Sequence, residues 1–169
     1  MIWTASIEEG LPGYGDPPVH LHAGRATPWS QGLVVRFAIQ GGRSWIANIH
    51  KGDGYCNALW RWDAAERAIA VAKGDAFLVH PDAPDSWRFL AHLATSCLFS
   101  DDGLRAYVAT YTDVVAVDPA GEIVWRRRVA LDGVEFDCLR DGVLAGRACM
   151  DPPDDWRAFS LSASDGSDA

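Results

Sequence analysis

The sequence CLFSDDGLRAYVATYTDVVAVDPAGEIVWRRR, residues 97–128, is the most regular stretch of the chain. Two runs within it, YVATY at 107–111 and VVAV at 114–117, are rich in the β-branched and aromatic residues that favour strands. DPAG at 118–121 favours a turn, because Pro fixes φ and Gly tolerates a positive φ. A third strand-like run, IVW at 123–125, follows. The stretch therefore predicts antiparallel strands joined by short turns.

The same pattern occurs a second time. A displacement of 38 residues superimposes residues 67–89 on residues 105–127, with seven identities in 23 positions. Trp87 and Trp125 form one of the seven identical pairs, and we expect them in equivalent positions of two superposable hairpins. Such repetition indicates a fold that is built from a recurring β unit.

Two weaker copies flank this pair. One covers residues 136–166, where Asp165 and Gly166 supply the last turn, and a partial one would consist of strands at 44–49 and 57–63. Each copy again has the composition of an antiparallel hairpin.

FSDDG, two strands and DPAGEIVW together resemble one blade of the WD40 or PQQ-like β-propeller repeats. The resemblance covers about half of the chain, most clearly residues 97–128 and less clearly residues 66–89 and 136–166. Propellers use at least four blades, more than 169 residues readily hold. We therefore expect an all-β fold of antiparallel blade-like sheets, stacked as a β-sandwich or an open partial propeller. The resemblance implies no particular activity, because propellers host both binding and catalysis.

The length suits one domain over residues 1–169. We expect an irregular segment at residues 1–30, where GLPGYGDPP is rich in Gly and Pro, then blade-like repeats at 31–161 and a polar tail at 162–169. Residues 64–73 are ambiguous. A capping-box spacing favours a helix there, whereas the repeat maps them onto a strand, which is the interpretation we favour.

The composition indicates which kind of partner the protein binds and in which compartment we expect it. A net charge of −8 disfavours nucleic acid, which needs clustered Lys and Arg, and permits a basic protein partner. No signal peptide or membrane-length apolar run is visible, so we expect a cytoplasmic protein without membrane contact. The four cysteines, Cys56, Cys97, Cys138 and Cys149, show no C-x-x-C spacing. We expect all four to be reduced thiols and at least three of them to be buried.

The histidines are the weakest of the chemical signals. His20 and His22 in HLH share one face of an extended chain and could begin a metal site. The alternative is a partly exposed strand with two polar side chains, and we expect no cofactor. His50, His80 and His92 stand alone in the sequence, and no nucleophile, phosphate-loop or dinucleotide motif is present.

The strongest local charge lies at DPPDDW, residues 151–156. Asp151, Asp154 and Asp155 would form a rigid acidic loop between two strands, with Trp156 as an aromatic anchor for a basic protein. The alternative is a solvated loop without a partner.

These observations favour a small non-enzymatic binding module, of which a bacterial immunity or inhibitor protein acting on a basic toxin is one form. The alternative is a small β-fold lyase, isomerase or hydrolase that uses His20, His22 or His92, with or without a metal. A third hypothesis is a domain that forms homo-oligomers through an edge strand.

Overall fold

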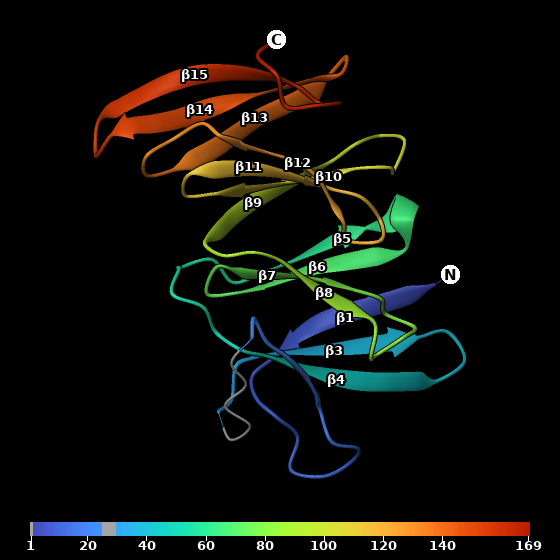
Figure 1. Ribbon diagram of the computed structural model, residues 1–169. Helices are drawn as coiled ribbons and strands as arrows, with labels where there is room; N and C mark the ends of the chain where they lie inside the picture. Colours follow the sequence, from blue (N-terminus) through green and yellow to red (C-terminus); the bar gives the residue numbers. More distant parts are fainter. Residues whose placement is uncertain (1, 25–29) are drawn as a thin grey trace.

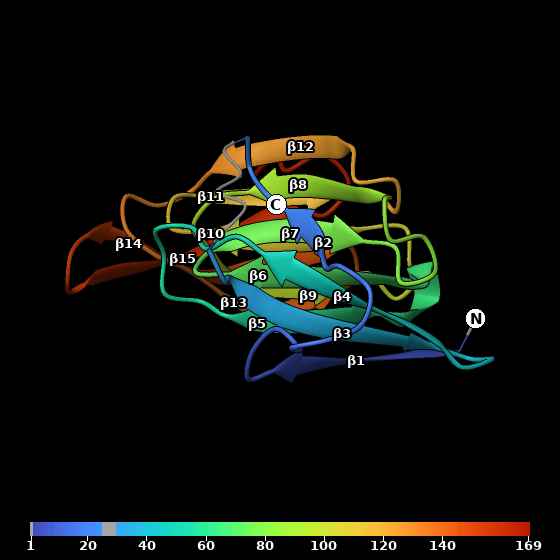
Figure 2. The same ribbon diagram turned by 90° about the horizontal axis from the view of Figure 1, so that it is seen from below.

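The computed structural model describes residues 2–24 and 30–169. Within these residues the strands form four sheets, which are stacked as layers from the N-terminal end to the C-terminal end of the chain (Figure 1). A view from below shows the strands of successive layers lying over one another (Figure 2). The expected all-β fold is confirmed, and the stack is not closed into a barrel.

The first sheet has the order β1-β3-β4-β2. Its strands are β1 (Trp3–Glu8), β2 (Val19–Leu21), β3 (Leu33–Ile39) and β4 (Arg43–Ile49). All pairs are antiparallel except β2 and β4, which run parallel. The expectation of an irregular segment at residues 1–30 is therefore wrong for β1 and β2. Both strands pair with residues far along the chain, and no local pattern reveals such pairing.

The second and third sheets are simple antiparallel meanders, β5-β6-β7-β8 and β9-β10-β11-β12. The second contains β5 (Ala58–Trp62), β6 (Arg67–Ala72), β7 (Asp75–Val79) and β8 (Trp87–Ala91). The third contains β9 (Ala94–Phe99), β10 (Ala106–Thr110), β11 (Asp113–Val117) and β12 (Ile123–Arg128). Within residues 64–73 the chain forms the strand β6, as favoured above, and not an α-helix; one 3-10 turn at Asp63–Ala65 precedes it. No helix of the described residues is long and apolar enough to cross a membrane.

The fourth sheet has the order β13-β14-β15. Its strands are β13 (Val134–Arg140), β14 (Val143–Asp151) and β15 (Asp155–Ser162). The polar tail expected at residues 162–169 folds back onto β15, where Leu161 forms a bridge with Asp168. The Ala169 amide also donates to the Ser160 carbonyl at 3.1 Å.

The second and third sheets share one register over three strands. Ala68 pairs with Val79 in the second sheet, and Ala106 pairs with Val117 in the third, each 38 residues further on. The pairing of β5 with β6 likewise matches that of β9 with β10. The prediction of equivalent hairpins is confirmed for these strands. The partial copy is wrong, because residues 44–49 and 57–63 lie in different sheets.

The fourth strands of these two sheets break the equivalence. Trp87 pairs with Val79, whereas Trp125 pairs with Ala116, because the register shifts between Ala116 and Val117. Trp87 consequently packs between the first and second sheets, and Trp125 between the third and fourth. The expectation that the two tryptophans occupy equivalent positions is therefore wrong.

A separate apolar cluster fills each space between neighbouring sheets. Both faces of the two middle sheets are buried as a result, and every residue of β7, β10 and β11 is buried. A strand that is covered on both sides needs apolar residues at every position. This explains why VVAV at 114–117 shows no polar alternation.

Candidate functional site

The acidic loop lies at the tip of the β14–β15 hairpin, which projects beyond the other layers (Figures 1 and 2). Asp151 ends β14 and Asp155 begins β15, so Pro152, Pro153 and Asp154 form the tip. All three tip residues are exposed. The loop is therefore open to a partner.

Trp156 is held in one position beside this tip. Its indole N–H donates to the Pro153 carbonyl at 3.1 Å, and the Arg147 guanidinium lies 5.8 Å from its ring centre. Gly133 lies so close that a Cβ there would be 2.9 Å from the ring. The side chain nevertheless keeps 37% of its surface exposed. A fixed but accessible indole is suited to act as an anchor, because little conformational freedom remains to be lost on binding.

The loop at 131–133 adds residues that sequence reasoning missed. The amides of Leu131 and Asp132 donate to the Cys149 carbonyl at 2.9 and 3.3 Å, so this loop lies along the end of β14. Leu131 is exposed, and the Asp132 carboxylate joins the acidic group. The link between β12 and β13 carries no acidic run, so its sequence did not indicate a site. The loop lies beside the acidic tip because it packs along the end of β14 in the folded protein.

We call Leu131, Asp132, Asp151, Asp154, Asp155 and Trp156 the hairpin surface. Burial raises the pKa of the Cys149 thiol beneath it, and the carboxylates of Asp132, Asp155 and Asp151 raise it further. The Asp155 carboxylate is already neutralised, because Arg157 binds it through Nε at 3.0 Å and Nη2 at 2.6 Å. This hydrogen bonding lowers the pKa of Asp155.

The remaining carboxylates of the hairpin surface have no cationic partner among residues 2–24 and 30–169. They belong to Asp132, Asp151 and Asp154. The negative potential of the surface therefore comes from these three residues. Of the three aspartates singled out in the sequence, Asp155 contributes least.

Three histidines gather at the ends of β2 and β4. His20 Nδ1 lies 3.4 Å from His50 Nε2, and the ring centres of His22 and His50 are 6.2 Å apart. Asn48 Nδ2 lies 3.3 Å from His20 Nδ1, and the rings of His22 and Trp87 meet edge to face with their centres 5.6 Å apart. We call His20, His22 and His50 the imidazole cluster. The parallel pairing of β2 with β4 brings His50 to the two residues of HLH, and no sequence signal indicated this contact.

The surroundings of His50 favour the neutral form of its ring. Burial lowers the pKa of His50, and the neighbouring His20 and His22 lower it further. His22 Nδ1 is buried without a hydrogen-bond partner in the described residues. No three His, Cys, Asp or Glu side chains of the described residues are arranged to hold a metal ion.

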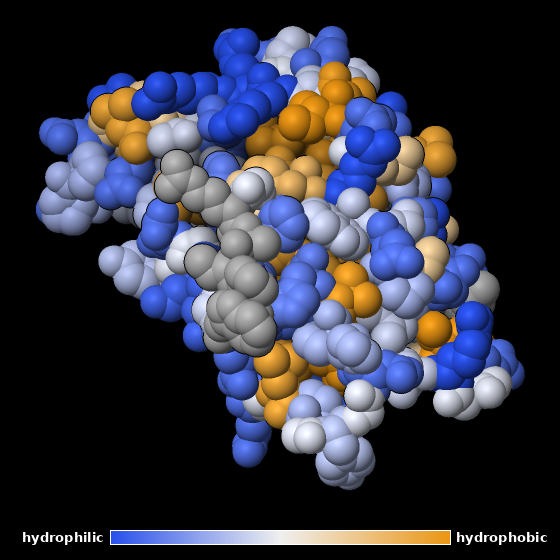
Figure 3. Space-filling model, turned by 60° about the horizontal axis from the view of Figure 1, so that its bottom comes forward, coloured by the Kyte–Doolittle hydropathy of each residue, from blue (hydrophilic) through white to orange (hydrophobic). Residues whose placement is uncertain are grey.

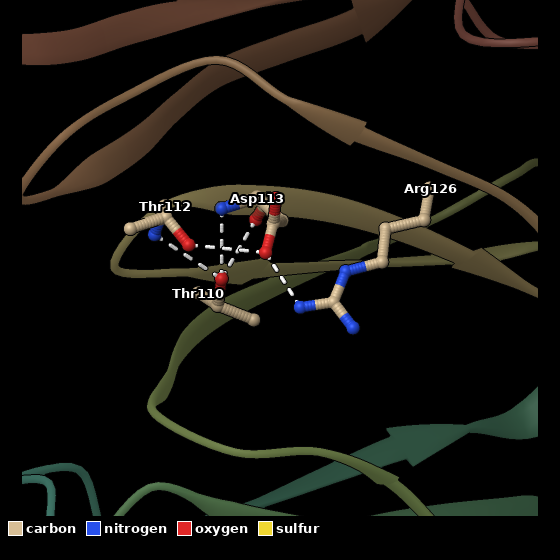
Figure 4. Close-up of polar contacts among 4 residues, drawn as sticks. All are labelled: Thr110, Thr112, Asp113 and Arg126. Carbon is tan, nitrogen blue, oxygen red and sulfur yellow. Dashed lines mark hydrogen bonds and ion pairs between the residues drawn. The ribbon is translucent and has the colours of Figure 1, made fainter.

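Two buried aspartates recur at the start of β7 and β11. Asp113 accepts from Arg126 Nη2 at 2.6 Å and from Thr112 Oγ1 at 3.0 Å, and its own amide donates to Thr110 Oγ1 at 2.9 Å (Figure 4). Asp75, the matching residue of the repeat, contacts His92 Nδ1 at 2.8 Å. Asp113 thus ties its hairpin to the fourth strand, and Asp75 ties its hairpin to the residue that follows the fourth strand, so both have a structural role.

A cavity of about 660 Å³ opens between the third and fourth sheets. It is lined by Leu104, Arg105 and Tyr107 on one side and by Leu139, Arg140 and Asp141 on the other. The face of the molecule drawn in Figure 3 is a mosaic of apolar patches and charged groups. The cavity mixes both signs of charge, so its lining selects no ligand class.

The four cysteines are free thiols, as expected, but fewer are buried than expected. Only Cys149 is buried, Cys56 and Cys97 are partly buried, and Cys138 is exposed. The expectation of three buried thiols is wrong, because Cys138 is exposed on the last sheet, and Cys56 and Cys97 pack against the core between the second and third sheets without being fully covered. Burial raises the pKa of Cys56 and of Cys97.

No protein-family model matches the chain, and no curated protein is significantly similar to it in sequence.

Proposed function

We propose that this protein is a non-enzymatic binding module, and that a basic protein docks on the hairpin surface. The observation that carries the proposal is the exposed, fixed ring of Trp156 beside three carboxylates that lack a cationic partner among the described residues. Tryptophan is enriched at the energetic centres of protein interfaces. Unpaired carboxylates around such an anchor favour a partner that supplies Lys or Arg.

The net charge of −8 supports the same class of partner, because the whole molecule attracts a cation. An immunity or inhibitor protein that captures a basic toxin in the cytoplasm is the form of the proposal that we favour. We also propose that the stacked sheets are blade-like units of the WD40 or PQQ-like type in an open partial propeller. The shared register of the second and third sheets supports this relationship.

The proposal makes a kinetic prediction. Electrostatic steering speeds association at low salt and fades once the Debye length falls below the range of the interaction. Substitution of Asp132, Asp151 and Asp154 by Asn should therefore slow association with a co-purified partner by about tenfold at low salt. Surface plasmon resonance at several salt concentrations measures this rate.

The matched control carries the same change in net charge elsewhere. Asp16, Asp85 and Asp101 are exposed and lie outside the hairpin surface. Their triple Asn variant should associate nearly as fast as the wild type. Equal slowing in both variants would show a general charge effect and would contradict a docking site at the hairpin.

The anchor is tested through dissociation. Trp156→Ala should speed dissociation at least about 30-fold, because anchors of this kind contribute about 2 kcal/mol or more. Tyr14, which is 91% exposed in another loop, provides the aromatic control, and Tyr14→Ala should leave dissociation unchanged. If neither variant changes dissociation, the indole is not an anchor.

The alternative of a histidine-dependent enzyme has one observation in its favour, which is that His50 joins His20 and His22. That hypothesis requires the imidazole cluster to take part in chemistry, with or without a metal. Metal analysis of the purified protein tests its metal-dependent form. A stoichiometric transition metal that disappears in His20→Gln would favour the enzyme over the binding module.

A further inference from the structure

One edge of the fourth sheet differs from the matching edges of its neighbours. In the second and third sheets the outer edge of the third strand is paired with a fourth strand, so β8 covers β7 and β12 covers β11. The fourth sheet consists, within the described residues, of three strands, and β15 takes the place of β7 and β11. The outer edge of β15 is therefore the position at which a fourth strand would pair.

The C-terminal tail pairs with one end of this edge. The Ala169 amide donates to the Ser160 carbonyl at 3.1 Å, and the Ser162 amide donates to the Ser167 carbonyl at 2.7 Å. The bridge between these two bonds is antiparallel. The edge of β15 thus accepts an antiparallel segment, and within the described residues this pairing stops at Ser160.

Beyond Ser160 the edge is open as far as the hairpin surface. Because the backbone groups of a strand alternate in direction, the bonds of Ser160 and Ser162 place the amide and carbonyl of Ala158 on the same edge. Ala158 is exposed, and none of residues 2–24 and 30–169 bonds its amide or its carbonyl. The Trp156 amide on this edge donates to the Asp154 carbonyl at 3.0 Å. Ala158 therefore offers one free backbone donor and one free acceptor to another chain.

The regular form of β15 distinguishes it from the outer strands of the neighbouring sheets. β8 and β12 each have an additional residue in their pairing, Leu90 and Val124, so these two edge strands are themselves bulged. The additional residue in the pairing of β14 with β15 is Met150, which belongs to β14. Bulges on an edge strand oppose pairing with another chain, whereas a regular edge favours it.

We propose, on the basis of the function proposed above, that an extended basic segment of the partner adds to the open edge of β15 as a further strand. Hydrogen bonds with Ala158 hold its backbone, as in other complexes in which a peptide joins the edge of a sheet. The exposed ring of Trp156 lies at the same edge. The carboxylates of Asp132, Asp151 and Asp154 belong to the same hairpin surface. These groups favour Lys and Arg in the added strand.

A second copy of this chain fits the edge less well. The open part of β15 centres on Arg157, so antiparallel pairing of two copies places the two Arg157 side chains opposite each other, which is destabilising. Each copy also has a net charge of −8, which opposes association of two copies and attracts a basic segment.

A synthetic octapeptide of alternating Lys and Thr is the probe that tests strand addition. The measured quantity is the rate at which the Ala158 amide exchanges with solvent, followed by NMR of the isotope-labelled protein. At a peptide concentration of about ten times the dissociation constant, about 90% of the protein is bound, so this exchange should slow about tenfold. The amides of Arg157 and Phe159 face β14 and should change little.

Two control peptides separate the effect of the backbone from the effect of charge. The same octapeptide with every backbone nitrogen methylated keeps its positive charge but cannot pair as a strand. An octapeptide of alternating Glu and Thr can pair as a strand but has the opposite charge. Neither control should slow the exchange of Ala158.

The outcomes distinguish strand addition from docking in general. If both lysine peptides shift the Trp156 indole signal equally and neither protects Ala158, strand addition is overturned and docking of a basic chain on the hairpin surface stands. Equal protection by the glutamate peptide would contradict the requirement for basic side chains. If neither lysine peptide changes either signal at millimolar concentration, strand addition is overturned, and the association rates described above decide the docking proposal separately.

A pair of variants tests the same edge in the protein. Ala158→Pro removes the free amide, and Pro is tolerated where an edge strand faces solvent, so this variant should bind the Lys–Thr peptide at least about fivefold more weakly. Ala158→Val keeps the amide and should bind like the wild type. If Ala158→Pro is poorly folded, the exchange rates of the wild type decide. Slowing of Ala158 exchange by higher protein concentration alone would show that a second copy occupies the edge, and would overturn the proposal.

Discussion

The second and third sheets show how far a repeated sequence imposes a repeated structure. The first three strands of each have the same register, and a buried aspartate opens the third strand in both. The fourth strands diverge, because one shift of register in β12 sends Trp125 to the opposite face from Trp87. Side chains alternate between faces with a period of two, so a shift of one residue is enough to reverse the direction of packing.

The divergence has a structural consequence. Trp87 helps to attach the first sheet, together with His22 and Phe77. Trp125 instead attaches the C-terminal tail, through its indole N–H to the Ala163 carbonyl at 3.1 Å and through contact with Gly166. The same residue type at the same place in the repeat therefore joins different neighbours to the stack.

The largest difference between the sheets should come from removing the tryptophans. Trp125 is 9% exposed and hydrogen-bonded, so Trp125→Ala should lower the free energy of unfolding by about 3–5 kcal/mol. Trp87 is only partly buried, so Trp87→Ala should cost about 2 kcal/mol. Urea denaturation measures both values. A greater loss in Trp87→Ala would contradict the assigned faces.

A glycine pair tests the contact between Trp125 and the tail. Gly166 has φ +72° and a Cβ there would lie 2.7 Å from the Trp125 ring, whereas Gly142 has φ +77° and open space around it. Gly142→Ala should cost about 1 kcal/mol from backbone strain alone. Gly166→Ala should cost about 3 kcal/mol, because steric overlap adds to the strain. Similar losses in the two variants would show that the ring does not lie over the tail.

The buried aspartates should give a smaller difference. Asp113→Ala leaves the network with Thr112 and Arg126 incomplete and should cost about 2 kcal/mol. Among the described residues, Asp75→Ala loses only the side-chain contact with the exposed His92 and should cost about 1 kcal/mol. Thermal unfolding measures both, and the reverse order would show that the network in Figure 4 stabilises the fold less than the single contact of Asp75 does.

The smallest effect should be a difference in labelling rate among the cysteines, since labelling an accessible thiol leaves the fold intact. A thiol reagent should modify Cys138 quickly, and Cys56 and Cys97 slowly, because the latter two lie against the core between the second and third sheets. Mass spectrometry of partly labelled protein identifies the order. Fast labelling of Cys97 would show that these two sheets separate easily.

The sequence predicted the parts of the fold that local chemistry determines. The strand at Arg67–Ala72 and the turn at Asp118–Gly121 were recognised because β-branched residues and Pro-Gly pairs act within a few positions. β1 and β2 were missed, since their stability comes from pairing with β3 and β4. The register shift in β12 was missed for a similar reason, as no residue of IVWRRR requires a bulge.

The candidate sites divide in the same way. Asp151, Asp154 and Trp156 were recognised because they are adjacent in the sequence, and the hairpin keeps them together. Asp132 and His50 were missed as members of their sites. Each joins its group through the packing of distant segments, and periodicity carries no information about that packing.

The central structural claim is that Trp87 and Trp125, which match in the repeated sequence, pack on opposite faces of their sheets. A NOESY spectrum of the isotope-labelled protein tests this claim most directly. The account predicts cross-peaks from the Trp125 indole to Gly166 and from the Trp87 indole to Phe77 and His22. Cross-peaks from Trp125 to core residues between the second and third sheets, such as Leu78, with none to Gly166, would contradict it.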